Sequence, residues 1–137
     1  MKYMNARLVA VCVVAVFAIV GGIPAANGQE AGAVKRSLVL KQDMDVPGRE
    51  AVMALVELPP GSAEGRHTHP AEVYVFVQEG MISLENEDKP TATLKAGDVF
   101  YIAPGKIHQA INNGNVTAKL AAVFVAEKGK PLTTQVK

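Results

Sequence analysis

The residues of this chain that are best suited to chemistry lie in the stretch HTHPAEVYVFVQEG, residues 67–80. His67 and His69 stand two apart, and on an extended strand such side chains point to the same face. The chain has one further histidine, His108. Neutral imidazole is a common ligand of zinc, iron, nickel and copper. Two histidines from one strand and a third from a distant strand can therefore form three corners of a metal site inside a barrel.

The alternative for each histidine is an ordinary surface or hydrogen-bonded side chain, and the His-x-His pair alone does not decide between the two. A carboxylate, Glu72, follows His69 by three residues. It is a candidate for a fourth ligand if its side chain turns to the same side as the histidines.

The segments that must position these side chains are short apolar runs separated by turn residues. We expect strands at residues 37–41, 51–58, 73–77, 81–84, 91–94, 99–102, 107–111 and 116–125. Strands at such regular spacing, broken by Gly and Pro, are typical of an all-β sandwich or barrel. Residues 118–126 are rich in Ala and Leu and could form a helix, but the β-branched residues around them favour a strand.

The N-terminus has the order of a secretory signal peptide. Lys2 and Arg7 precede an apolar stretch of 13 residues, 8–20, which small residues follow. We predict cleavage after Gly28. The alternative is an uncleaved anchor, but the apolar stretch is shorter than the roughly 20 residues that span a bilayer. The protein would then be periplasmic or secreted and would meet the membrane only through residues 1–28.

Removal of residues 1–28 takes away two basic groups and the one cysteine, Cys12, and leaves 12 basic and 13 acidic groups. A formal charge of −1 without a basic cluster argues against nucleic acid as a partner. Without cysteines, the core, assembly or a metal must stabilise the fold. We expect a flexible tether at residues 29–35, one β domain at residues 36–127 and an exposed tail at residues 128–137.

The spacing of glycines and histidines forms two patterns. In the first, five residues separate Gly61 from His67-Thr68-His69, and the segment closes at Gly80. In the second, Gly97 is followed after five residues by Ala103-Pro104-Gly105, then by His108 and Asn112. These patterns resemble the two motifs of the cupin superfamily, specifically of its small single-domain (type-2) members, with Ala103 as the one departure in the second motif.

The resemblance implies a single jelly-roll β-barrel of two antiparallel sheets with one divalent metal inside, namely Zn, Fe, Ni, Cu or Mn. The ligands would be His67, His69, His108 and a glutamate, but the family's glutamate falls at position 73, which is Val73 here. A bulge at Pro70 and Ala71 would bring Glu72 inward. Without one, Glu72 faces solvent, and three histidines hold the metal with water or substrate.

The resemblance also implies a function at the metal and a homodimer. One hypothesis is a metal-dependent enzyme acting on a small organic molecule, with a dioxygenase-like reaction as its most concrete form. The other is a non-catalytic binding or sensing protein with a structural metal or none. The sequence does not assign catalytic residues, so whether the protein is an enzyme stays open at this point.

Overall fold

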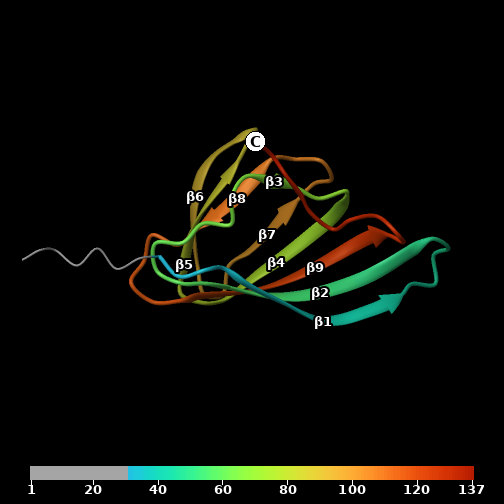
Figure 1. Cartoon of the computed structure of the whole chain (residues 1–137), viewed down its shortest axis with the longest axis horizontal. Coiled ribbons are helices and arrows are strands. Elements are labelled where there is room, and N and C mark those ends of the chain that lie inside the picture. Colours follow the sequence, from blue (N-terminus) through green and yellow to red (C-terminus); the bar gives the residue numbers. More distant parts are fainter. Residues whose placement is uncertain (1–30) are drawn as a thin grey trace, which may run out of the picture.

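Residues 31–137 are described by a computed structural model and consist of strands and loops (Figure 1). The strands are β1 (Lys35–Asp43), β2 (Arg49–Leu58), β3 (His67–Thr68), β4 (Ala71–Glu79), β5 (Met81–Asn86), β6 (Lys89–Lys95), β7 (Val99–Ile102), β8 (His108–Ile111), β9 (Ala118–Glu127) and β10 (Thr134–Gln135). In this part of the chain, no helix has the length and hydropathy needed to cross a membrane. The predicted signal peptide, residues 1–28, lies outside the described residues.

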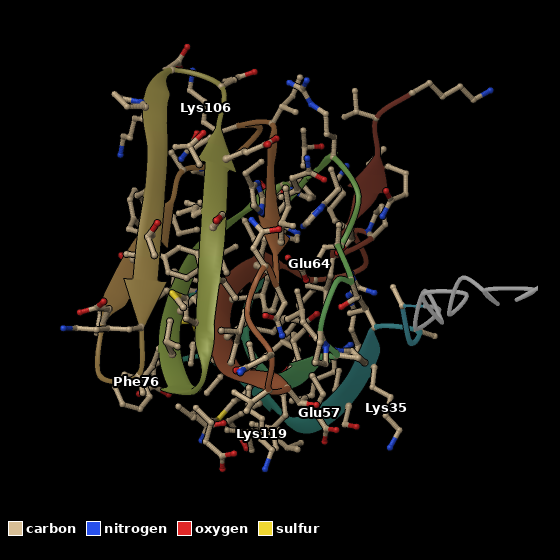
Figure 2. All side chains as sticks on the ribbon, turned by 90° about the vertical axis from the view of Figure 1, so that its left-hand side faces the viewer. Lys35, Glu57, Glu64, Phe76, Lys106 and Lys119 are labelled. Carbon is tan, nitrogen blue, oxygen red and sulfur yellow. The ribbon has the colours of Figure 1, made fainter. Side chains whose placement is uncertain are left out.

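The strands form two five-stranded antiparallel sheets. One sheet has the order β1-β2-β9-β4-β7, and the other has the order β10-β3-β8-β5-β6. Side chains fill the space between the two sheets (Figure 2). Several neighbouring strands, such as β2 and β9 or β3 and β8, come from distant parts of the chain, as in a jelly roll. The prediction of a single all-β barrel is confirmed.

The alternation of side chains along β4 shows how the sequence builds the core. Ala71, Val73, Val75 and Val77 are buried, while the residues between them are exposed. Side chains of a strand alternate between its faces, so every second side chain of β4 packs inside the barrel. The same alternation in β2, β5 and β9 supplies the other large buried residues, which include Val52, Leu58, Ile82, Leu120 and Phe124.

All eight predicted strands are present, and residues 118–126 belong to β9 rather than to a helix. Most side chains of residues 128–137, the predicted tail, are exposed. The segment folds back along the barrel, and β10 pairs with β3. Without β10, β3 would be an edge strand with unpaired backbone groups, and the tail pairs with these groups. At the other end of the described residues, β1 begins at Lys35.

Candidate metal centre

The two sequence motifs meet at the three histidines. His67 of β3 lies directly opposite His108 of β8 in the antiparallel register. The backbone N–H of Gly105, from the turn before β8, donates a hydrogen bond of 2.8 Å to the backbone oxygen of His69. This pairing joins segments that are about 40 residues apart in the sequence. It places all three imidazoles on the inner side of the barrel.

The three rings form a compact, buried group. Their centroids lie 4.3–4.9 Å apart, and one nitrogen from each ring lies within 4.8 Å of the others. His67, His69 and His108 are 2%, 5% and 5% exposed. Two nitrogens that bind one zinc ion at about 2.0–2.1 Å lie at most about 4.2 Å apart, so a shift of a few tenths of an ångström lets these rings share one ion. The structure thus brings together the three predicted histidines in a group that could hold a metal.

Backbone carbonyls orient each imidazole. The Nδ1 atoms of His67, His69 and His108 lie 2.7, 2.7 and 3.0 Å from the backbone oxygens of Gly65, Leu132 and Lys106. A carbonyl oxygen can only accept a hydrogen bond, so each Nδ1 carries the proton. Each Nε2 then keeps its lone pair for a ligand. Metal-binding histidines typically have this arrangement, in which the other ring nitrogen donates to a fixed acceptor.

Burial also keeps the rings of His69 and His108 neutral. It lowers the pKa of His69 from 6.5 to about 4 and lowers the pKa of His108, and the neighbouring histidines act in the same direction. Metal binding requires unprotonated imidazole nitrogens. At neutral pH, protons therefore do not compete for the Nε2 atoms of His69 and His108.

Glu72 does not belong to this group, and the expectation of an inward turn is corrected. It is exposed on the outer face of β4 and accepts a hydrogen bond of 3.1 Å from the Tyr74 hydroxyl. The register between β4 and β9 is regular from Ala71 to Val77, so no bulge turns Glu72 inward. Val73 instead lines the cavity beside the histidines, and the structure therefore offers three histidine ligands.

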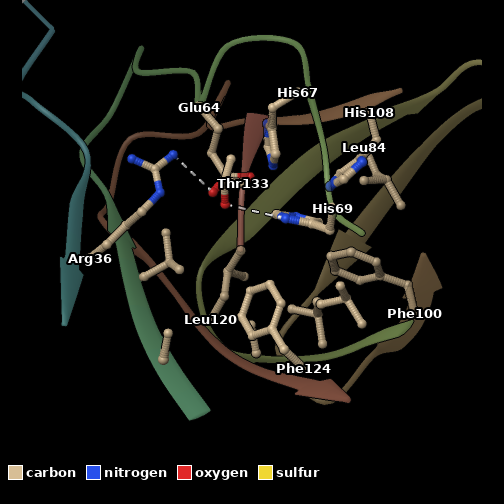
Figure 3. Close-up of a pocket in the computed structure, with 15 residues that line it drawn as sticks. Arg36, Glu64, His67, His69, Leu84, Phe100, His108, Leu120, Phe124 and Thr133 are labelled. Atoms are coloured by element: carbon tan, nitrogen blue, oxygen red, sulfur yellow. Dashed lines mark hydrogen bonds and ion pairs between the residues drawn. The ribbon is translucent and has the colours of Figure 1, made fainter. Parts of the chain in front are cut away.

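The histidines lie in the wall of a cavity of about 60 Å³ (Figure 3). A space of this size has room for a few water molecules, and so for a ligand of only a few non-hydrogen atoms. The inner wall is apolar, with Val75, Leu120, Phe100 and Phe124 among its residues. Phe124 meets the ring of His69 edge to face at a centroid distance of 5.1 Å. An apolar wall excludes water around the imidazoles and strengthens electrostatic interactions with a bound ligand.

Three polar residues of the cavity were not predicted from the sequence: Arg36, Glu64 and Thr133. Thr133 comes from the C-terminal segment, and its hydroxyl lies 3.3 Å from Nδ1 of His69. Glu64 precedes the His-x-His pair and could have been suspected from that position alone. Arg36 and Thr133 gave no local signal, because strand pairing places them at the cavity.

Asn112, the last residue of the second motif, has a structural role. It is fully buried, and its amide donates hydrogen bonds of 2.8 Å to the backbone oxygens of Leu58 and Val116. Its side-chain oxygen accepts a hydrogen bond from the Gly114 N–H. Asn112 therefore fixes the loop that leads into β9 and is not a residue of the cavity.

The fold and the site define a class of protein: a small double-sheeted barrel with a cluster of three inward-facing histidines. The model of the family described as "Cupin domain" (Cupin_2) matches residues 54–124, which include both motifs and the three histidines. This match covers more than half of the chain. The chain belongs to the cupin family.

Two known proteins are similar in sequence. The oxalate-binding protein of Thermotoga maritima is 35% identical over 77 residues, which are 54% of this chain and 61% of that protein. Germin-like protein subfamily 2 member 1 of Arabidopsis thaliana is 36% identical over 89 residues, 59% of this chain and 41% of that protein. The chain thus spans less than two thirds of the length of either relative.

Solved structures show the same fold. A protein with a double-stranded β-helix domain from Klebsiella pneumoniae aligns over 77% of this chain and 86% of its own, with a TM-score of 0.65 and 23% identity. Oxalate oxidase aligns over 63% of this chain and 46% of its own, with a TM-score of 0.57 and 26% identity. Both are barrels of the kind described above.

Proposed function

We propose that this protein binds a small organic acid at a divalent transition metal held by His67, His69 and His108. The observation that carries this proposal is the set of three Nδ1–H groups bound to backbone carbonyls, which leaves three Nε2 atoms available for one ion. Three protein ligands leave at least one coordination position for a bound molecule. The apolar cavity beside the rings provides space for it.

An acid is the ligand class that the charges favour. With Glu72 on the outer face, the histidine group contains no carboxylate, so a bound divalent ion keeps its full charge and attracts an anion. The names of two similar proteins, the oxalate-binding protein and oxalate oxidase, support the same class. The all-nitrogen ligand set favours zinc, iron, nickel or copper over manganese, which prefers oxygen ligands.

A dioxygenase-like reaction on the same ligand is the second candidate, and one observation favours it. Glu64 places a carboxylate in the wall of the cavity, with its side chain only 11% exposed. Such a group can accept a proton from a bound molecule. The metal, when bound, would supply Lewis-acid activation of an oxygen atom. Simple binding is our first proposal because it requires only the histidines and the cavity.

Elemental analysis tests the metal site. Residues 29–137 would be purified without chelator or immobilised nickel, as wild type and as Glu72→Ala and His108→Ala. We expect about one metal ion per chain in wild type and in Glu72→Ala, and a loss of most of the metal in His108→Ala. Loss in Glu72→Ala would make Glu72 a ligand after all. Metal-free wild type, even after reconstitution with zinc or iron, would refute the proposal.

We further propose export and dimerisation. The order of charged, apolar and small residues in 1–28 supports export to the periplasm or the medium, and mass spectrometry of the exported chain would test cleavage after Gly28.

A homodimer is supported by β1, an edge strand whose nine residues are all exposed and include Leu38, Val39 and Leu40. Such an edge can pair with a second copy.

A further inference from the structure

One cation reaches the histidine cavity from the edge of the barrel. Arg36 of β1 lies opposite Val56 of β2 in the antiparallel register, and Val56 lines the cavity. Directly opposed residues of antiparallel strands point to the same face. The register therefore directs the Arg36 side chain to the cavity, where it forms part of the wall (Figure 3). Its side chain remains 44% exposed, so it lies where the cavity meets solvent.

Glu64 holds this arginine in place. A guanidinium nitrogen of Arg36 lies 3.3 Å from a carboxylate oxygen of Glu64, whose side chain is 11% exposed. A carboxylate that is so well covered needs a partner, and the arginine provides it. In Figure 3, the Glu64 carboxylate lies between Arg36 and the group formed by Thr133 and the histidines. The ion pair of Arg36 and Glu64 thus lies between the open side of the cavity and the histidines.

Most of the hydrogen-bonding capacity of Arg36 is not used by this pair. Within residues 31–137, the guanidinium donates one side-chain hydrogen bond, to Glu64. A guanidinium has five N–H donors in a planar fork that fits a carboxylate with two parallel bonds. The remaining donors can therefore receive an anionic group that enters the cavity. A carboxylate that pairs with two of these donors would form a stronger contact than the single bond to Glu64.

We propose that Arg36 is a second anchor for the ligand, so that one carboxylate pairs with the guanidinium while another oxygen of the same molecule faces the three histidines. This inference rests on the proposed function, and it narrows the ligand to small dicarboxylates such as oxalate or malonate. Glu64 is the counter-charge that the ligand competes with. It holds the arginine in position when no ligand is bound and opposes the binding of any anion beside it.

The test compares binding of oxalate and malonate to zinc-loaded wild type, Arg36→Gln and Arg66→Gln by isothermal titration calorimetry. Arg66 is the matched control, because it neighbours His67 in sequence but is exposed and lines a different hollow. We expect Arg36→Gln to weaken binding of both acids by about 10-fold or more with unchanged zinc content. We expect Arg66→Gln to stay within about twofold of wild type.

Glu64→Gln gives a change in the opposite direction. Loss of the counter-charge should tighten oxalate binding by about threefold or more, again with zinc retained. Arg36→Gln that binds both acids as wild type does would overturn the role of Arg36 and leave the proposed function intact. Loss of zinc in Glu64→Gln would also overturn the inference, since Glu64 would then be a metal ligand. Zinc-loaded wild type that binds neither acid would overturn this inference, and the proposed function would fall with it only if a monocarboxylate such as acetate also failed to bind.

Discussion

The three imidazoles differ in how far along the chain their hydrogen-bond acceptors lie. His67 and His108 each donate to a carbonyl two residues earlier, those of Gly65 and Lys106. His69 donates to Leu132, which is 63 residues away. The orientations of His67 and His108 are thus set by the local backbone. The orientation of His69 requires the C-terminal segment to be folded against it, so it depends most directly on tertiary structure.

The lowered pKa of His69 predicts how the metal-free protein responds to pH. Its folded pKa of about 4 lies below the ordinary value of 6.5, so the unfolded chain binds more protons between these values. The stability that neutral His69 contributes is fully present above pH 6.5 and is lost as the pH falls towards 4. We expect thermal unfolding in EDTA to show a drop of several degrees between pH 7 and 4.5.

The control for this prediction is His69→Gln, which cannot titrate. Its melting temperature should fall less over the same pH interval than that of the wild type. Equal slopes for the two proteins would mean that other groups, such as the surface carboxylates, account for the acid sensitivity.

The sequence predicted the histidines but not the place of the fourth motif residue. His67, His69 and His108 could be assigned because their spacing matches both motifs and because strand pairing brings the motifs together. Glu72 could not be placed, since its side depends on whether the backbone before it is bulged. A regular β4 puts Val73 at the cavity. Local residue preferences do not distinguish these two backbones.

At the scale of elements, the turns carried most of the predictive information. Gly80 shows why: it has a φ of +74°, and a Cβ there would lie 2.9 Å from Cα of Ala118. Only glycine meets both requirements, so its position marks the turn between β4 and β5. The two-residue strands β3 and β10 had no such signal. They exist because each pairs with a distant segment, which local sequence does not encode.

The C-terminal segment is the element whose removal should affect the metal most. Leu132 supplies the acceptor for His69, and β10 pairs with β3, which carries His67. A chain that ends after Lys130 loses both interactions. We expect its zinc affinity, measured by competition with a chelating dye, to fall about 10- to 100-fold, the range found when partners of metal-binding histidines are removed.

A chain that ends after Gln135 is the matched control, because it keeps Leu132, Thr133 and β10 and lacks only two residues. It should bind zinc within about threefold of the full chain. If the chain that ends after Lys130 kept the zinc affinity of the full chain, the C-terminal segment would have no influence on metal binding by His69.

At the scale of the whole molecule, β1 is the longest of the four edge strands within residues 31–137, the others being β6, β7 and β10. It pairs with β2 on one side only and forms the edge of its sheet. Leu38, Val39 and Leu40 in its middle are 60%, 50% and 50% exposed. The pairing of β1 with β2 has a register shift between Leu38 and Leu40, at Val39. If two copies of β1 pair in antiparallel fashion about this point, Lys35 lies opposite Asp43 and Leu38 lies opposite Leu40. The strand is thus self-complementary in charge and in apolar character, as a twofold interface requires.

This arrangement predicts a dimer that charges in the middle of β1 disrupt. Size-exclusion chromatography with light scattering should give wild type twice the mass of one chain and Leu38→Lys/Leu40→Lys the mass of one chain, because the like charges introduced at positions 38 and 40 would face each other across the interface. Val116→Lys is the control, since Val116 is 57% exposed but lies outside β1, and it should remain dimeric.

A double variant that stays dimeric would move the interface to another surface, such as the outer face of β4 and β7, where Tyr74, Phe76 and Tyr101 are 42–46% exposed. If wild type is monomeric at micromolar concentration, the proposed dimer is wrong, and β1 is an edge strand that does not pair with a second copy.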